Sequence, residues 1–311
     1  MIKNLTNYSL VILGILFFFS NIKILPAQTP SDAIMMKKGE LCLALIYDYG
    51  SWDQYWEGAT LRGNENIGTL TRTSLNPMIA AGITDKIGVL IALPYISTKS
   101  SGGQMAGVNG FQDINLAVKA EILNQKLGKG KLALLATGAF ATPATNYLSD
   151  YMPYSLGLGA PEGTLRGILQ YKLDFGLYAR VSLAHLWRGL TEVERDYYYN
   201  NGSYYTTLMD VPNAWNYNGV VGIWLLDESL KVEANYLAMT STSGDDVRKY
   251  NMGQPTNKMD FGQVGGSAQY YFGESKGLGL LVYYSQMIQG RNMGKFTNLG
   301  LGLTYQFKVI K

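Results

Sequence analysis

The chain has 311 residues and a formal net charge of +3, and only 16% of its residues are charged, below the roughly 25% typical of soluble domains. Apolar side chains make up 47% of the chain and tyrosine alone contributes 23 residues, a composition too apolar and too weakly charged for intrinsic disorder. The single cysteine, Cys42, excludes a disulfide-linked scaffold. The small net charge argues against a dedicated nucleic-acid-binding protein.

The first 27 residues have the features of a secretory signal peptide. Lys3 precedes an apolar run that extends from Leu10 to Phe19, and Ala27 precedes the polar Gln28. We expect cleavage after Ala27 and export of the mature chain. A retained membrane anchor is the alternative, but the apolar run is short for a span of about 20 residues. We therefore divide the chain into a signal peptide (1–27), a short periplasmic N-terminal segment (28–38) and one domain (39–311).

The rest of the chain is dominated by alternation of apolar and polar residues, the period of a β-strand whose two faces meet different surroundings. The segment Gln112–Ile122 is the clearest example, with Leu116 and Val118 on one face and Asp113 and Lys119 on the other. About twelve segments of this kind have the length of a tilted membrane strand. In chain order they are Glu40–Tyr49, Leu70–Ile83, Ile87–Tyr95, Gln112–Ile122, Lys131–Thr142, Thr164–Leu173, Phe175–Leu186, Trp215–Leu226, Leu230–Met239, Gly262–Phe272, Leu278–Ser285 and Phe296–Phe307.

The connections between these segments alternate between short turns and long loops. Short turns follow the second strand (84–86) and the sixth (174), whereas long loops follow the first (50–69) and the third (96–111). Short turns, long loops and an even number of strands are typical of an outer-membrane barrel with both chain ends in the periplasm. We therefore expect an all-β, transmembrane, antiparallel up-and-down β-barrel. A secreted β-sandwich is the alternative, but it would carry more charge on its outward face.

The alternation also predicts which side chains face the inside of the barrel. We interpret these residues either as a network that fills a narrow barrel or as the lining of a pore, whose apolar and aromatic members would suit apolar solutes. Because the charges look balanced in sign, strong ion selectivity is not expected. The candidates are Arg72, Met78, Asp113, Asn115, Lys119, Glu121, Arg166, Tyr178, Arg180, Trp224, Lys231, Glu233, Leu237 and Tyr283.

Enzymatic chemistry has little support in the sequence. The sole histidine, His185, falls on the outward face by alternation, beside Trp187, and a serine hydrolase needs a histidine within reach of its serine. One histidine and one cysteine are too few for a nitrogen and sulfur metal site, so we expect no catalytic residue, metal or cofactor.

The fourth long loop is rich in tyrosine, a residue that supplies rigid contact area for surface recognition. Its candidates for extracellular recognition are Tyr197, Tyr198, Tyr199, Tyr204 and Tyr205.

One stretch of the chain resembles a known family. Leu93-Pro94-Tyr95, followed by a Gly/Ser-rich loop and by the spacing of Gly110, Asp113 and Lys119, is similar to the outer-membrane transporters of the phenol meta-pathway type. That family distantly resembles the long-chain fatty-acid transporters. The resemblance covers residues 83–119 and implies passive diffusion of small hydrophobic or aromatic compounds across the outer membrane of a Gram-negative bacterium. The alternative is a closed structural or surface-binding barrel that acts through the tyrosine-rich loops.

The last predicted strand resembles the C-terminal sorting signal of outer-membrane proteins. Gly302, Tyr305 and Phe307 occupy its glycine and aromatic positions, although Gly300 replaces a usual polar residue and four residues follow Phe307. The resemblance implies recognition of the strand ending at Phe307 by the barrel-assembly machinery. The expected partners are therefore this machinery, the lipid bilayer of the outer membrane and a small hydrophobic substrate, with no nucleic acid.

Overall fold

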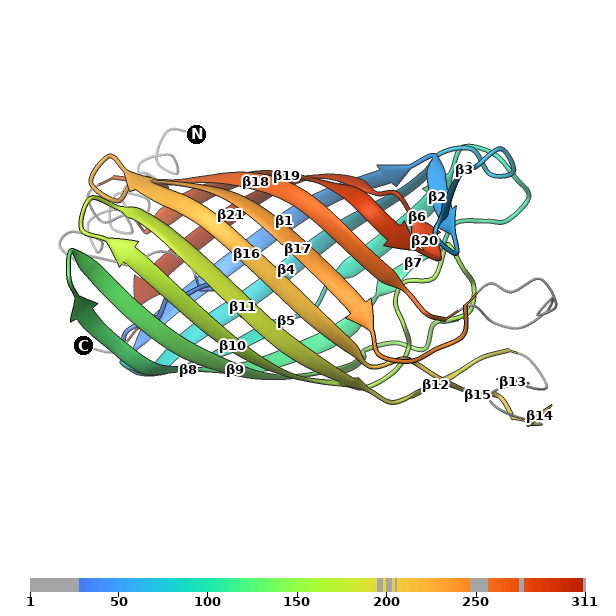
Figure 1. Cartoon of the computed structure of the whole chain (residues 1–311), viewed down its shortest axis with the longest axis horizontal. Helices are drawn as coiled ribbons and strands as arrows, with labels where there is room; N and C mark the ends of the chain where they lie inside the picture. Colours follow the sequence, from blue (N-terminus) through green and yellow to red (C-terminus); the bar gives the residue numbers. More distant parts are fainter. Residues whose placement is uncertain are drawn as a thin grey trace, which may run out of the picture.

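The protein is a closed antiparallel β-barrel in the computed structural model, which describes residues 28–194, 198–199, 203–204, 206–246, 257–273 and 277–309 (Figure 1). The expected all-β barrel is confirmed, and each of the twelve predicted strands overlaps an observed one. No helix in the described residues has the length and apolar character to cross a membrane. The barrel strands are β1 (Glu40–Trp52), β4 (Leu70–Thr84), β5 (Ile87–Ala92), β8 (Asp113–Leu127), β9 (Gly130–Pro143), β10 (Glu162–Leu173), β11 (Leu177–Arg188), β16 (Ala214–Leu225), β17 (Leu230–Ser241), β18 (Asp260–Phe272), β19 (Leu278–Arg291) and β21 (Thr297–Lys308).

The first and last strands close the barrel. Strand β1 pairs with β4 on one side and with β21 on the other, in a register that runs from Glu40 opposite Lys308 to Ser51 opposite Thr297. The short turns lie at one end of the barrel, and the long loops project from the other (Figure 1). Short turns are periplasmic in barrels of this type, so the long loops form the extracellular end.

The two faces of the wall differ as the alternation requires. Large apolar side chains cover the outside, for example Val181 at 57% exposure and Leu303 at 53%, whereas their neighbours Arg180 and Thr304 are buried inside. An apolar outer band with a polar interior suits a barrel surrounded by lipid. Closure then leaves no backbone N–H or C=O group of an edge strand facing hydrocarbon.

The wall near the predicted loop 96–111 differs from the sequence-based expectation. After β5 the strand is interrupted at Leu93–Pro94 and continues as β6 (Tyr95–Ser100), and the chain returns as β7 (Asn109–Phe111). Proline has no N–H to donate to a ladder, so Pro94 produces the break. Beyond it the alternation resumes, since Ile96 and Thr98 are buried at 2% and 3% exposure. This loop is therefore shorter than expected.

The extracellular loops form small β-sheets of their own. They are the sheet of β2 (Gln54–Glu57), β3 (Thr60–Gly63) and β20 (Met293–Gly294), the pair of β12 (Leu190–Glu192) and β15 (Leu208–Asp210), and the pair of β13 (Tyr198–Tyr199) and β14 (Ser203–Tyr204). The first sheet joins the loop after β1 to the loop before β21, and so covers the seam where the barrel closes.

A charge on the outer face tests whether that face is lipid-exposed. We expect Val181→Arg to lower the free energy of unfolding in phospholipid vesicles by about 2–4 kcal/mol, the cost of an arginine near the bilayer midplane. The conservative variant Val181→Leu is the control and should change stability by less than about 1.5 kcal/mol. Urea titration of tryptophan fluorescence measures both, and equal stability of the two variants would contradict a lipid-facing position.

Candidate functional site

The predicted lumen residues fall into groups at different depths of the barrel. Arg72 and Asp113 lie at the extracellular mouth, where Asn115 donates to the Asp113 carbonyl. Arg166 donates to Ser182 and Asn216 further in, whereas Glu121 accepts from Asn124 near the turn between β8 and β9. The remaining candidates lie deeper or on the wall between these levels: Met78, Lys119, Tyr178, Arg180, Trp224, Lys231, Glu233, Leu237 and Tyr283.

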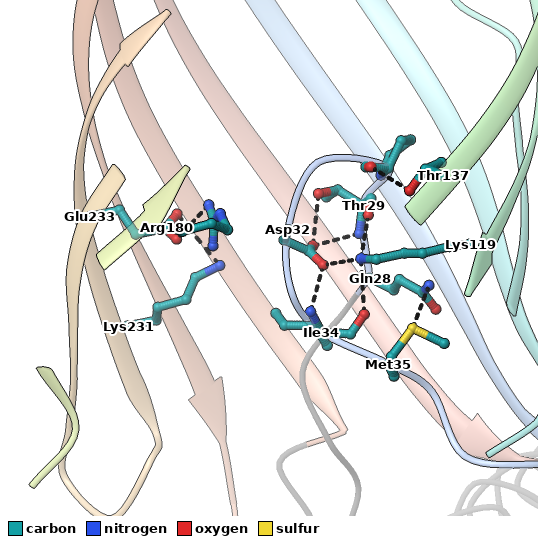
Figure 2. Close-up of polar contacts among 11 residues, drawn as sticks. Gln28, Thr29, Asp32, Ile34, Met35, Lys119, Thr137, Arg180, Lys231 and Glu233 are labelled. Atoms are coloured by element: carbon teal, nitrogen blue, oxygen red, sulfur yellow. Dashed lines mark hydrogen bonds and ion pairs between the residues drawn. The ribbon is translucent and has the colours of Figure 1, made fainter. Parts of the chain in front are cut away.

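The N-terminal segment, residues 28–38, lies inside the barrel at its periplasmic end and is fastened by a buried ion pair. Lys119 is fully buried, and its Nζ lies 2.6 Å from Asp32 Oδ1 (Figure 2). The same ammonium donates to the carbonyls of Thr29 and Ile34 at 2.9 and 3.0 Å. Asp32 in turn accepts from the backbone N–H groups of Thr29 and Ile34. One wall lysine thus organises a complete turn of the segment.

Apolar contacts fix the same segment to the wall. Met36 is fully buried in a cluster with residues of β1, β4, β5 and β8, and Met35 enters a second cluster with β9 and β10. Burying a methionine side chain contributes about 1.5–3 kcal/mol. The backbone also comes very close to β4, because a Cβ at Gly82 would lie 2.1 Å from the Lys37 carbonyl oxygen. Glycine is therefore required at position 82.

The opposite wall carries a second charged group. Arg180 Nη2 lies 3.0 Å from Glu233 Oε1, and Lys231 Nζ lies 3.7 Å from the other oxygen of the same carboxylate. The hydroxyl of Tyr178 donates to Glu233 at 2.7 Å, and Lys231 lies over the ring of Trp224. These five predicted residues come together on β11, β16 and β17.

A cavity of about 340 Å³ lies in the lumen beside these two charged groups. Thr29 and Asp32 of the N-terminal segment bound one side, and Lys231 and Glu233 bound another. Apolar side chains complete the lining from β1, β4 and β19: Ala44, Ile46, Met78, Leu281 and Tyr283. The segment packs against β1, β4, β5, β8, β9 and β10, and the cavity lies between it and strands β17, β18 and β19.

A larger cavity of about 720 Å³, which we call the outer vestibule, opens at the extracellular mouth. Its apolar lining is aromatic and methionine-rich: Trp52, Tyr55, Trp56, Met152, Met259, Met293 and Phe296. Trp52 contacts Phe296 edge-on with ring centroids 6.1 Å apart. Gly294 allows this packing, since a Cβ there would lie 2.4 Å from the Trp52 ring. Aromatic faces and flexible thioethers suit apolar ligands of varied shape.

The loop between β9 and β10, residues 144–161, forms one wall of the vestibule. Arg72 holds it by donating from Nη2 to the Leu156 carbonyl at 2.9 Å, and Tyr154 is fully buried. Tyr147 donates to Asp113 at 2.5 Å and accepts from the Gly159 N–H. Burial, together with the hydrogen bond to Asp113 and its charge, raises the pKa of Tyr147, so the phenol stays protonated and keeps donating.

The residues weighed for catalysis and surface recognition lie elsewhere. His185 is on the outer face of β11, with its ring between those of Trp187 and Trp215 at 4.5 and 4.6 Å. In the described residues no three histidine, cysteine, aspartate or glutamate side chains form a group that could hold a metal. Tyr198, Tyr199 and Tyr204 lie in the short hairpin of β13 and β14. Tyr197 and Tyr205 are outside the described residues.

Sequence reasoning missed the partner of Lys119 and most of the vestibule. Asp32 lies in a segment without alternation, and nothing local marks it as the counterion of a lysine 87 residues away. Of the vestibule tryptophans, Trp52 ends β1 and Trp56 lies in β2 within the following loop, where the alternation has stopped. A usable signal existed in Trp52 and Trp56, because tryptophans within an otherwise polar loop need an apolar partner.

Comparisons with known proteins support the fold. The chain is similar to the COG4313 outer membrane channel from Pseudomonas putida F1, with a TM-score of 0.70 and 14% identity over 90% of this chain and all of that one. It also matches the NanC porin (TM-score 0.47, 10% identity, 84% of this chain and 98% of that one). A third match is the autotransporter translocator domain NalP from Neisseria meningitidis (0.44, 14%, 87% and 89%).

Comparison of the amino-acid sequence alone with known proteins gives no match. No protein-family model matches the chain. No curated protein matches it either. At 14% identity the first structural match establishes the architecture of an outer-membrane barrel, and substrate and activity have to be argued from this chain's own residues.

The buried pair between Lys119 and Asp32 can be tested by a double-mutant cycle. We expect Lys119→Met to lower the free energy of unfolding by about 3–5 kcal/mol, because it leaves the Asp32 carboxylate buried without its counterion. Adding Asp32→Asn removes the unpaired charge and should recover part of that loss. Urea unfolding in detergent micelles measures each variant.

A lysine outside the barrel interior provides the control. Lys172 pairs with Glu228 at the exposed periplasmic rim, so Lys172→Met should cost only about 0–1 kcal/mol. Equal losses for the Lys119 and Lys172 variants would show that the N-terminal segment is not fastened by this pair.

Proposed function

We propose that the protein is a channel of the Gram-negative outer membrane that admits small hydrophobic or aromatic compounds by passive diffusion. The observation that carries this proposal is the outer vestibule, a cavity of about 720 Å³ whose apolar lining is rich in aromatic and methionine side chains, beside polar residues such as Arg72 and Asp113. A general water-filled pore has little use for such a lining. A vestibule of this kind instead concentrates apolar solutes at the mouth of the barrel.

The lumen beneath the vestibule supports the same proposal. A cavity of about 340 Å³ remains beside the N-terminal segment, and Met78, Leu281 and Tyr283 are among the residues that line it. A wall with apolar and aromatic groups among polar ones offers a solute successive weak contacts, as conduction requires. The resemblance of residues 83–119 to the phenol meta-pathway transporters implies a similar class of solute.

Location and assembly belong to the same proposal. The chain carries the features of a signal peptide before residue 28, and its wall presents an apolar band to the outside. Strand β21 ends at Lys308 and contains Tyr305 and Phe307, whose spacing resembles the sorting signal of outer-membrane proteins. We infer that the signal peptide is removed after Ala27 and that the assembly machinery recognises this last strand.

The direct test is uptake of solutes into liposomes that carry the refolded protein. We expect a small neutral aromatic tracer to enter these liposomes faster than it leaks through bare lipid. The protein should accelerate the entry of a sugar of similar size less. Equal acceleration of both solutes would indicate a general pore. Acceleration of neither would favour the closed barrel that acts through its tyrosine-rich loops.

Substitution in the lumen tests the route. We expect Met78→Trp to slow aromatic uptake about tenfold, equivalent to about 1.4 kcal/mol of added barrier, because the larger ring fills the inner cavity. The matched control is Leu75→Trp, which adds the same ring on the same strand at a position with 42% exposure on the outer face. Similar slowing by both variants would place the route outside the inner cavity.

A further inference from the structure

Three tyrosines on the inner face of the wall each lie on a glycine of the neighbouring strand. The two residues of each pair stand directly opposite one another: Tyr178 and Gly222, Tyr271 and Gly279, and Tyr283 and Gly300. A Cβ on the glycine would crowd the ring, at 2.5 Å from Cζ of Tyr178 and 3.1 Å from Cδ1 of Tyr271. Glycine within a strand often marks such a close approach, and here it lets each ring lie along the wall.

Of the three rings, that of Tyr283 borders the inner cavity of about 340 Å³. Tyr178 and Tyr271 are buried, at 3% and 2% exposure, and do not line this cavity. The hydroxyl of Tyr178 donates to Glu233, and the ring of Tyr271 is stacked with that of Trp224. The ring of Tyr283 is therefore the one that a molecule in the inner cavity can contact.

The glycine at position 300 decides where the Tyr283 ring can lie. A Cβ at Gly300 would overlap ring carbons Cε1 and Cζ of Tyr283 and would lie 2.6 Å from its hydroxyl oxygen. Because the backbone of β21 lies behind Gly300, a displaced ring can only move away from the wall, towards the cavity. At Gly302, the next residue on the same face, a Cβ would lie 3.4 Å from Ile46 and Leu281, an ordinary contact distance. One added methyl group should therefore act differently at these two glycines.

We propose that Tyr283 is the surface on which aromatic solutes stack in the inner cavity, and that Gly300 is a positioning residue that keeps the passage beside this ring open. A planar aromatic solute gains more from an aromatic ring than a saturated ring of the same size does. The inference rests on the proposed channel function and adds to it a preference for aromatic over saturated rings. It also gives a structural reason for Gly300, where the last strand departs from the polar residue usual in the sorting signal.

Benzamide and cyclohexanecarboxamide test the stacking surface, because both are neutral, carry the same amide and are alike in size. Uptake of each into liposomes is corrected for its leak through bare lipid. We expect the wild-type protein to carry benzamide about threefold faster than the saturated amide. Tyr283→Leu should remove this preference, and Tyr283→Phe should retain it. Equal uptake of the two amides by the wild-type protein, or a preference that survives Tyr283→Leu, would overturn the role of Tyr283.

The same assay tests Gly300. We expect Gly300→Ala to slow the entry of both amides about tenfold, because the displaced ring narrows the cavity. Gly302→Ala is the matched control, with the same methyl group on the same face of β21, and should change the rates less than about twofold. The double variant Tyr283→Leu with Gly300→Ala should regain the rate of Tyr283→Leu alone.

Equal rates for the two alanine variants, or slow entry that persists in the double variant, would overturn the role of Gly300. If Gly300→Ala refolds poorly, the double variant should recover the refolding yield, and a yield that stays low would also overturn it. These outcomes leave the channel function standing as long as the wild-type protein accelerates either amide. Acceleration of neither amide by the wild-type protein would reject the channel function itself.

Discussion

The requirement that every backbone polar group find a partner inside lipid governs this molecule. It is met when β1 pairs with β21 along its length, so that the sheet has no edge. The interruption at Pro94 occurs where β4 changes partner from β5 to β6, and the chain compensates locally: Leu93 donates to the Pro77 carbonyl and Gln112 to that of Pro94. The wall can therefore tolerate two prolines without exposing unpaired groups.

A barrel of this width has to fill its interior, and the chain does so unevenly. Methionines and the Lys119–Asp32 pair fasten the N-terminal segment to one half of the wall, and the other half keeps a cavity. The charged residues are divided in the same way. Asp32 of the segment pairs with Lys119 on β8, whereas Arg180 on β11 and Lys231 on β17 share the carboxylate of Glu233. The charged pairs are thus distributed around the lumen as unevenly as the packing is.

The sequence predicted the wall well because alternation is a local signal of period two. It placed Lys119, Arg180 and Lys231 inside by parity, and it found the twelve membrane strands. It could not pair Lys119 with Asp32, because that contact depends on a segment without regular structure folding back into the barrel. It also missed the extension of the sheet by β6 and β7, where a glycine- and serine-rich stretch hid two short strands. The outer vestibule depends on loops packing against one another, for which the chain has no periodic signal.

The position of the N-terminal segment makes the wall and the segment depend on each other. Residues 28–38 precede β1 and are enclosed by the wall, with the Lys37 carbonyl close to Gly82. Lys119 on β8 is fully buried and its only carboxylate partner among the described residues is Asp32 of the segment. A barrel without residues 28–38 would therefore expose an unpaired ammonium to its lumen, so the segment is part of the barrel interior as much as the strands are.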